Sequence, residues 1–388
     1  MAEAVYRGRG AGVPYDEYIT LINEVFGFDG VEQDFRTLLP KLYRPGRTPQ
    51  NENYVAVEDG VCVAAVGAYS HEIRVCGTII PCRGIGNVAV ARAARGRGYM
   101  KDCMRMALTD MVRDGIALST LGGRRQRYRY FGYEKAGICY TFAVNADNLR
   151  HTLGADYVSG LDIRQVNADD ETLLTAIRTL SSSGVYAPIR AAADFFDILS
   201  TWRATVWAAL RDGKLVGYAL RGTDGQISEI RVTDAGELLP FLHALRRHLD
   251  IDTLTLRLPE HEDACLRVLA PVAEGCQIGC SMSYNVLNYR LVCDAFFNLR
   301  ATYAPLPDGN LTVCIHGLAG DERLSRSVRD GVPSVLPSEP GREPELELSH
   351  VEAMELLFAP FSPGRRKLSP AVQAWLPLPI WMYKADEV

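Results

Sequence analysis

The tetrapeptide Arg-Gly-Arg-Gly occurs twice in the chain, at residues 7–10 and at residues 95–98. Each copy combines cations with glycines, which let a backbone approach an anion closely. The second copy follows an apolar segment, 87–91, and a segment with helical spacing begins directly after it. The first N–H groups of a helix have no partner within the helix and carry partial positive charge. We therefore expect a pyrophosphate site at 95–98.

Two other glycine-containing strings are less suitable. The string GIGNVA at 84–89 satisfies G-x-G-x-x-A, but it precedes a predicted strand and does not open a helix. The N-terminal RGRGAG at 7–12 follows a possible short strand, but Pro14 removes a backbone donor where the anion would bind. We interpret the N-terminal copy as a basic loop near the chain end.

The composition is that of a globular protein, because 47% of the 388 residues are hydrophobic and 23% are charged. The formal net charge is −5, and a dedicated nucleic-acid binder is usually basic, so we expect no nucleic-acid partner. No stretch approaches 18 apolar residues, and the N-terminus lacks the pattern of a signal peptide. We expect no membrane association and a cytoplasmic location.

The ten cysteines form no C-x-x-C pair, and most lie in apolar segments. Without a secretory signal, this pattern predicts reduced, buried thiols. Cys276 and Cys280 lack a second pair of ligands, so we expect no metal.

The first part of the chain alternates between strand and helix patterns. We expect a helix over 15–26, hairpins that turn at Asp59-Gly60 and Cys76-Gly77, a strand over 87–91, a helix over 100–115, and strands over 116–121 and 139–144.

The middle of the chain repeats this plan. Residues 205–220 parallel 53–68, with an apolar strand, an Asp-Gly turn and a second apolar strand. Residues 228–258 parallel 86–121 in the order strand, connector, helix and strand. This indicates a duplicated domain. The second copy has only TDAG in place of the glycine-arginine loop, so we expect a ligand in the first copy alone.

From residue 285 the pattern changes. We expect strands over 283–292 and 309–317, and a Pro-rich loop over 332–346. Ser349 and Glu352 form a capping-box pattern before an apolar helix. A frayed chain end would be polar, but residues 374–388 are largely apolar, which predicts that the end is packed.

The segment VAVARAARGRGYMKDCMRMAL at 88–108 resembles the acyl-CoA-binding segment of the GNAT acetyltransferases. With YRYFGYEKAG at 128–137 and the degenerate second copy, the chain resembles the Eis (enhanced intracellular survival) group. The resemblance implies an α/β (mixed α+β) fold with two tandem GNAT-type folds and a sterol-carrier-like α+β domain. These would be 1–147, with the acetyl-CoA site, 148–284, which is degenerate, and 285–388, with a tail that docks into the active site.

The resemblance also implies roles for residues. Tyr128 would be the general acid that protonates the leaving CoA thiolate, and the terminal carboxylate of Val388 would be the general base. Met100 departs from the Gly or Ala common in the superfamily, and the family's chain end is often aromatic where this chain ends in Val388. The residues implied to hold the pantetheine arm and the pyrophosphate of acetyl-CoA are Val88, Ala89, Val90, Arg95, Gly96, Arg97, Gly98, Tyr99 and Met100.

The chemistry itself requires such groups. A primary amine with a pKa near ~10 is mostly protonated at neutral pH, so a base must accept a proton before attack. A tyrosine hydroxyl can donate a proton to sulfur. Tyr130 and Tyr133 remain alternatives to Tyr128 as the acid.

Two further groups have open roles. The arginines of RRQRYR could bind the CoA 3′-phosphate or an acidic partner, or form an exposed loop; they are Arg124, Arg125, Arg127 and Arg129. Residues after the first helix could line an acceptor pocket, or be core and cap residues; they are Glu24, Phe26, Phe28 and Asp29.

The leading hypothesis is an acetyl-CoA-dependent N-acetyltransferase that acts on an amine, such as an aminoglycoside, a polyamine or a lysine side chain. The family resemblance implies a homohexamer. The alternative hypothesis is a non-catalytic CoA- or lipid-binding regulatory protein.

Overall fold

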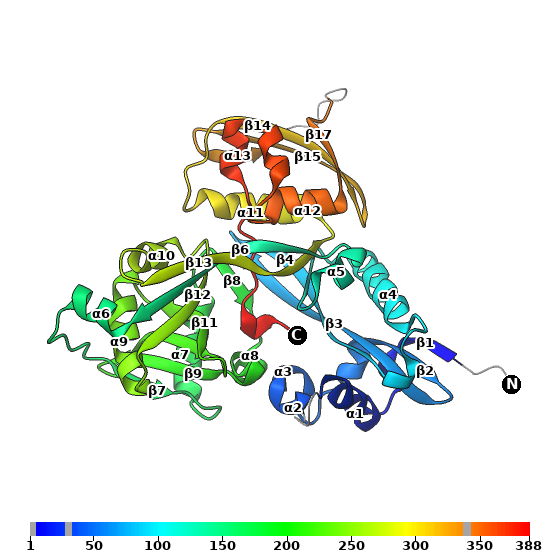
Figure 1. The fold of residues 1–388 in the computed structure, drawn as a ribbon, viewed down its shortest axis with the longest axis horizontal. Helices are drawn as coiled ribbons and strands as arrows, with labels where there is room; N and C mark the ends of the chain where they lie inside the picture. The colour runs from blue at the N-terminus through cyan, green and yellow to red at the C-terminus, as the bar shows by residue number, and fades with distance from the viewer. Residues whose placement is uncertain (1–4, 28–32, 337–342) are drawn as a thin grey trace.

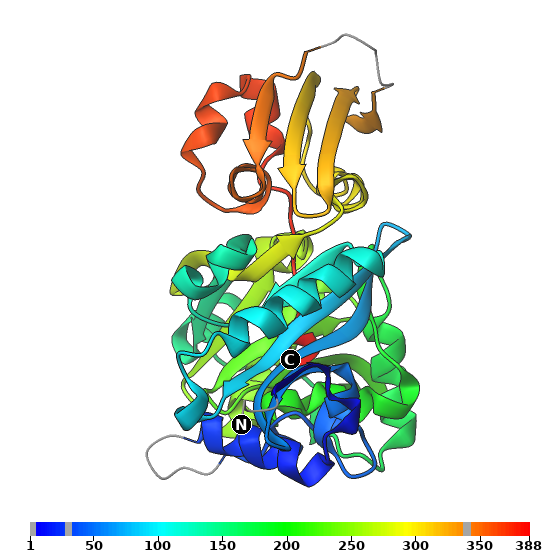
Figure 2. The ribbon, with the colours of Figure 1, turned by 90° about the vertical axis from the view of Figure 1, so that its right-hand side faces the viewer.

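A computed structural model describes residues 5–27, 33–336 and 343–388. Most strands form one thirteen-stranded sheet, and a separate four-stranded sheet lies above it. We call residues 5–145 the first lobe, 146–274 the second lobe and 287–375 the C-terminal lobe. Residues 275–286 form a strand that is described below, and residues 376–388 form the tail, which runs from the C-terminal lobe to a position between the other two lobes (Figures 1 and 2).

In the first lobe, neighbouring strands follow chain order, from β1 to β5. Its helices α1 and α4 cover opposite faces of the sheet. The apolar stripe of α1 includes Tyr18 and Ile22, and that of α4 includes Met104 and Met111. The elements are β1 (Val5–Arg9), α1 (Tyr15–Phe26), α2 (Phe35–Leu38), α3 (Pro40–Tyr43), β2 (Asn53–Glu58), β3 (Val61–Val75), β4 (Thr78–Val90), α4 (Tyr99–Arg113), β5 (Leu118–Leu121), α5 (Arg125–Tyr128) and β6 (Glu134–Asn145).

The predicted hairpins are confirmed. Asp59 and Gly60 have φ values of 47° and 85°, and Cys76 and Gly77 have 47° and 83°. These left-handed pairs suit the two-residue turns whose twist matches paired strands. The strand expected at 87–91 is the end of β4, so it is not a separate element.

The N-terminal Arg-Gly-Arg-Gly is not a basic loop, because Arg7, Gly8 and Arg9 lie in β1 and pair with β2. The Arg7 Nε lies 3.2 Å from Asp102 and an Arg9 guanidinium nitrogen lies 3.0 Å from Asp110, both on α4. An edge strand with these ion pairs binds the helix rather than an external phosphate.

The second lobe repeats the order of the first. Strands β9, β10 and β11 are antiparallel neighbours, and α9 connects β11 to the parallel strand β12. Helix α9 packs Leu238, Phe241 and Leu245 into the core of the second lobe. The elements are α6 (Ala146–Leu153), β7 (Asp162–Gln165), α7 (Glu171–Ser181), β8 (Tyr186–Ile189), α8 (Phe195–Leu199), β9 (Thr205–Arg211), β10 (Lys214–Arg221), β11 (Gln226–Val232), α9 (Leu238–Leu249), β12 (Thr253–Pro259) and α10 (Asp263–Leu269).

Strand β13 (Gly275–Val286) lies between β5 and β6, and β6 in turn pairs with β12 of the second lobe, so one sheet runs through both lobes. The boundary expected at 284/285 therefore lies inside β13, and that at 147/148 lies inside α6. The cysteines are free, but Cys276 and Cys280 on β13 are exposed, so the expectation of buried thiols is wrong for these two. Their side chains leave the core because the first half of β13 is exposed on both faces.

The C-terminal lobe places two helices between its sheet and the large sheet (Figure 1). The capping box of Ser349 and Glu352 is confirmed. The strand expected over 283–292 ends at Val286; Asn288 then caps a helix, accepting a hydrogen bond of 2.9 Å from the Leu291 N–H. The Pro-rich loop contains a short strand, β16. The elements are α11 (Tyr289–Ala301), β14 (Gly309–Gly317), β15 (Gly320–Arg329), β16 (Val332–Val335), β17 (Leu346–Ser349), α12 (His350–Phe358) and α13 (Pro370–Trp375).

The tail is packed, as its sequence predicts. Leu378, Ile380 and Tyr383 are buried in a core cluster that includes residues of both the C-terminal lobe and the large sheet. Within the described parts of the chain, no helix is both long enough and apolar enough to cross a membrane.

Candidate active site

One edge of β4 is open beyond its midpoint. On one side, β4 pairs with β3 as far as Val90 and Ala64; on the other, it pairs with β5 only as far as Ile85 and Leu121. The N–H of Ala91 donates to the Val63 oxygen at 2.8 Å, so it points to β3. Because successive residues of a strand direct their backbone groups to opposite edges, Val88 and Val90 direct theirs to the open edge.

The loop at 95–98 lies at the end of this edge. Gly96 and Gly98 have φ values of 86° and 87°, a left-handed conformation that other residues rarely adopt. A Cβ at either position would meet no atom within 4 Å, so the glycines serve the backbone turn and not close packing. Gly98 is the N-cap of α4, whose first N–H groups therefore face the loop.

A cavity of about 780 Å³ joins the open edge to the loop. Val88 and Val90 line it at the strand, and Arg95 lies beside it with its Nε 3.5 Å from the Val90 oxygen. The residues lining the cavity are Val25, Phe26, Val88, Val90, Ala94, Arg95, Gly96, Gly98, Tyr99, Met100, Lys101, Arg124 and Arg127. Among these described residues there are four cations and no carboxylate, so the cavity suits a polyanion.

Two residues expected at the donor site do not line the cavity. Ala89 pairs with Ala65 of β3 and packs its side chain into the core beneath α1. Arg97 directs its guanidinium to Glu58, at 2.8 and 2.9 Å from the two carboxylate oxygens. The Tyr99 hydroxyl donates to the same carboxylate.

The four arginines after β5 divide into two pairs. Arg124 and Arg127 line the cavity. Arg129 places its Nε 2.8 Å from Glu134 and a terminal nitrogen 2.9 Å from Glu355, and Arg125 pairs with the same two carboxylates. Since Glu355 lies on α12, the second pair attaches the first lobe to the C-terminal lobe.

The three candidate tyrosines lie in different surroundings. Tyr128 is buried against Gly123, where a Cβ would lie 2.6 Å from its ring. Burial raises the pKa of Tyr128, so its hydroxyl stays protonated at neutral pH. Tyr130 is 61% exposed and accepts a hydrogen bond of 2.9 Å from Arg105. The Tyr133 hydroxyl is buried 2.6 Å from that of Ser119.

The chain end lies against β4. A Cβ on Gly84 would be 2.6 Å from the Cγ2 of Val388, and one on Gly86 would be 2.9 Å from the terminal carboxyl carbon. The strand can approach the terminus this closely because neither residue has a side chain. The terminal carboxyl group is thus beside β4, two residues before Val88.

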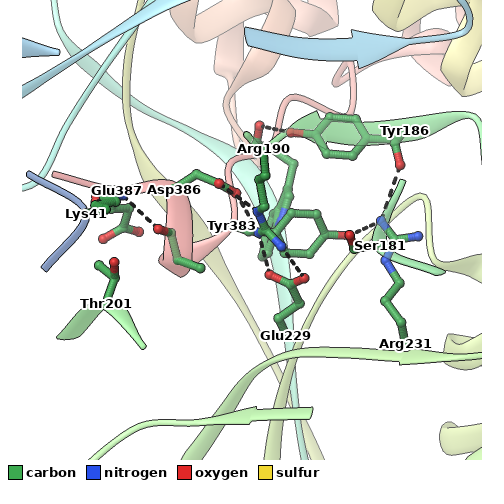
Figure 3. Close-up of polar contacts among 12 residues, drawn as sticks. Lys41, Ser181, Tyr186, Arg190, Thr201, Glu229, Arg231, Tyr383, Asp386 and Glu387 are labelled. Carbon is green, nitrogen blue, oxygen red and sulfur yellow. Dashed lines mark hydrogen bonds and ion pairs between the residues drawn. The ribbon is translucent and has the colours of Figure 1, made fainter. Parts of the chain in front are cut away.

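Buried charges hold the tail in this position (Figure 3). The Nζ of Lys41 donates to the carbonyl oxygens of Ala385 and Glu387, both at 2.7 Å. Arg190 binds Asp386 at 2.9 and 2.7 Å and Glu229 at 2.9 and 2.7 Å, with these three side chains almost fully buried.

The buried cations and carboxylates alter one another's ionisation. Burial lowers the pKa of Lys41 to about 8, although the nearby Asp386 opposes this effect. Burial alone would raise the pKa of Asp386, but Arg190 holds it below its ordinary value. Asp386 therefore stays charged at neutral pH, and its ion pair with Arg190 joins the tail to the second lobe.

Sequence reasoning did not identify Lys41, Arg190 and Glu229, which meet only in the folded chain. It did note Gly84 and Gly86, but only as a nucleotide-binding string. Glycines at alternate positions of a strand could have indicated close approach of another segment. Of the residues expected near an acceptor, Phe26 lines the cavity, Glu24 is exposed, and Phe28 and Asp29 lie outside the described residues.

Residues 14–136 match the family model described as "Acetyltransferase (GNAT) domain". The chain contains a GNAT acetyltransferase domain. The match runs from the residue before α1 into β6, and so includes the open edge of β4, the glycine-arginine loop and Tyr128. The GNAT domain identifies the chain as an acyltransferase.

Three solved structures share the fold over most of their length. The GCN5-related N-acetyltransferase from Kribbella flavida is 19% identical, with a TM-score of 0.63 over 97% of this chain and 96% of that one. The one from Anabaena variabilis is 16% identical, with a TM-score of 0.64 over the same shares. Eis1 from Mycobacterium abscessus is 12% identical, with a TM-score of 0.54 over 90% of this chain and 88% of that one. No curated protein sequence matches the chain.

Proposed function

We propose that this protein transfers an acetyl group from acetyl-CoA to a primary amine by direct attack in a ternary complex. The observation that carries the proposal is the position of the terminal carboxyl group. It lies beside Gly86, in the same strand whose open edge, at Val88 and Val90, leads to the cation-lined cavity. A candidate base and a candidate donor site are thus adjacent.

The donor would bind along the open edge and end at the loop. The backbone groups of Val88 and Val90 would form hydrogen bonds to the amide-containing arm of acetyl-CoA. The N–H groups around Gly96, Gly98 and Met100 would hold the pyrophosphate. Arg124 and Arg127 would meet the remaining 3′-phosphate.

The reaction needs a base that accepts a proton from the acceptor and an acid that protonates the leaving thiolate. The Val388 carboxylate would accept a proton from the ammonium form of the acceptor, and the free amine would attack the thioester carbonyl carbon. A backbone N–H of the open edge would stabilise the negative charge on the carbonyl oxygen. As the C–S bond breaks, Tyr128 would donate its proton to the thiolate. The nitrogen, which is positively charged after its attack, would lose its extra proton, and this proton would restore the Tyr128 hydroxyl. We favour Tyr128 over the other two because Tyr130 is exposed and bonded to Arg105, and the Tyr133 hydroxyl is engaged with Ser119.

The wider organisation proposed for the chain is that of an Eis-like protein. In this proposal the second lobe is a degenerate GNAT-type fold, and the C-terminal lobe is a sterol-carrier-like domain. We further propose a cytoplasmic homohexamer, which light scattering would distinguish from a monomer. The repeated element order of the two lobes supports the first part of this proposal.

The test is thiol release from acetyl-CoA across a panel of aminoglycosides, polyamines and lysine peptides, with the products weighed by mass spectrometry. The proposal predicts release that depends on an amine and a product heavier by one acetyl group. The alternative is a non-catalytic CoA- or lipid-binding regulatory protein. Tight acetyl-CoA binding without amine-dependent release, for every acceptor, would reject catalysis and support that alternative.

A further inference from the structure

Asn87 interrupts the regular alternation of β4. Gly84 and Gly86 face the terminus and the α1 side of the sheet, whereas Ile85 packs on the α4 side. Regular alternation would place residue 88 with the glycines, but Val88 packs on the α4 side, like Ile85. One extra residue in the strand, a β-bulge, has this effect. The register of β3 and β4 shifts here, between Ala65 and Gly67, and Asn87 has a left-handed φ of 41°.

The side chain of Asn87 is fixed by groups from three other elements. Its Oδ1 accepts hydrogen bonds from the hydroxyl groups of Tyr43 on α3, at 2.9 Å, and Tyr69 on β3, at 2.8 Å. Its Nδ2 donates to the Oδ1 of Asn53 on β2, at 2.8 Å. All of these residues are buried. Gly67 leaves space for the amide, because a Cβ there would lie 2.4 Å from Oδ1 of Asn87.

A third tyrosine adjoins this cluster without reaching Asn87. The hydroxyl of Tyr18 lies 3.0 Å from that of Tyr69 and 3.5 Å from that of Tyr43, and its ring stacks on Tyr43. Burial raises the pKa of each of these tyrosines, for Tyr69 to about 12. Their hydroxyl groups therefore remain neutral donors over the pH range in which the protein would act.

The bulge relates the two parts of the candidate site. On its N-terminal side, Gly86 contacts the terminal carboxyl group. On its C-terminal side, Val88 and Val90 present their backbone to the cavity. A left-handed backbone conformation costs free energy at a residue other than glycine. The hydrogen bonds of Oδ1 and Nδ2 hold Asn87 in this conformation.

We propose that Asn87, held by Tyr43 and Tyr69, is a positioning residue that sets the terminal carboxyl group and the donor-binding edge of β4 in one geometry. The inference rests on the proposed function, because it assigns the terminus and the open edge the roles given there. Asn87 itself is not a catalytic residue, because it acts on the terminal carboxyl group and on the open edge only through the backbone of β4.

The tyrosines provide a matched test. Tyr43→Phe and Tyr18→Phe each remove one buried hydroxyl from stacked neighbouring rings, but only Tyr43 touches Asn87. The double variant Tyr43→Phe/Tyr69→Phe removes both donors to Oδ1. Three readouts apply to each variant: kcat and KM for acetyl-CoA, the rate at which carboxypeptidase removes Val388, and the temperature of unfolding.

We expect the double variant to lower kcat by about tenfold to a hundredfold, since small misplacements of reacting groups have effects of this size. It should also speed the removal of Val388, and Tyr43→Phe should act in the same direction. Tyr18→Phe should leave kcat and the removal rate within about twofold of wild type, whatever its unfolding temperature. Equal effects of Tyr18→Phe and Tyr43→Phe, or an unchanged kcat and removal rate in the double variant, would overturn the proposal.

Asn87→Gly serves if the double variant does not fold, because glycine accepts the left-handed backbone but lacks the amide. It should reproduce the loss in kcat and the faster removal of Val388; wild-type values would overturn the proposal. Failure of the proposed function would appear separately, as wild-type protein that shows no amine-dependent thiol release. In that case, acetyl-CoA affinity and the removal of Val388 still test the geometry.

Discussion

The first and second lobes share one order of elements but differ in the connector between a strand and the helix that follows it, which are β4 and α4 in the first lobe and β11 and α9 in the second. In the first lobe, Gly96 and Gly98 are left-handed, and Arg95 extends beside the cavity. In the second lobe, Asp234 accepts a hydrogen bond of 2.8 Å from the N–H of Gly236. In the second connector, the Asp234 carboxylate accepts from the backbone N–H group of the loop itself. The first connector has no carboxylate in this position, and its N–H groups and Arg95 lie beside the cavity. In the proposed function, this connector, and not the architecture, determines which lobe binds a phosphate.

The strands before these connectors differ in a related way. Asn87 and Glu229 each lie three residues before the end of their strand, and each is buried and bound by tyrosine hydroxyl groups. Asn87 shapes the strand that receives the terminus. Glu229 binds Arg190, which holds Asp386 of the tail. The second lobe, which lacks the glycine-arginine loop, thus holds the tail whose end reaches the first lobe.

The largest effect is expected from removing the chain end. Deletion of Glu387 and Val388 leaves Asp386 with its partner Arg190, but removes the carboxyl group from β4. We expect kcat to fall by about a thousandfold, because the base is lost, while the Kd for acetyl-CoA stays within about threefold of wild type. Stopped-flow thiol release and calorimetry measure the two. Undiminished turnover would reject the terminal carboxylate as the base.

A somewhat smaller loss is expected from Tyr128→Phe. Losing the acid should lower kcat by about a hundredfold to a thousandfold without weakening acetyl-CoA binding. Tyr130→Phe is the control, because Tyr130 is exposed and bonded to Arg105; it should keep near wild-type kcat. Full activity of Tyr128→Phe would transfer the acid role to Tyr133, Tyr130 or water.

The connectors themselves give a matched pair. Gly98→Ala forces a side chain onto a φ of 87° at the start of α4, so we expect the Kd for acetyl-CoA to rise by about tenfold. Gly236→Ala in the second lobe should leave that Kd unchanged, although it crowds the Asp234 carboxylate. Calorimetry measures both. If Gly236→Ala weakens binding as much as Gly98→Ala does, the assignment of the donor site to the first lobe is wrong.

The smallest effect is expected at Arg124 and Arg127, the two arginines after β5 that line the cavity. Replacing Arg124 and Arg127 with Ala should weaken acetyl-CoA by about threefold to tenfold, and should affect 3′-dephospho-CoA less, because charge-assisted bonds to the 3′-phosphate are lost. Arg125→Ala should affect neither ligand, since Arg125 pairs with Glu134 and Glu355. Equal weakening of both ligands by the double replacement would show that these arginines do not meet the 3′-phosphate.

Local sequence patterns predicted the parts of the fold that local forces determine. The helix at 15–26 has the predicted bounds, and the Asp-Gly turns and the Ser349 capping box formed as expected. The insertion of β13 beside β5 could not be predicted, because it joins segments more than 150 residues apart in the chain. Helix α11 was missed because the apolar segment before it continues the strand pattern of β13.

In the candidate site, too, the sequence predicted the features that depend on neighbouring residues and missed those that depend on distant segments. The loop at 95–98 was identified from its own residues and the elements beside it. The place of Val388 came from the family resemblance, since no local pattern links a chain end to Gly86. Lys41 and Arg190 were missed because their partners are tail groups that no local pattern relates to them. Asn87 was missed because a bulge depends on the neighbouring strand.

The central claim is that the first lobe alone binds the acyl donor, at the loop 95–98. Isothermal titration of the full chain with acetyl-CoA tests it most directly. The account predicts one site per chain, which Gly98→Ala weakens and Gly236→Ala does not. Two sites per chain, or a single site unaffected by Gly98→Ala, would contradict it.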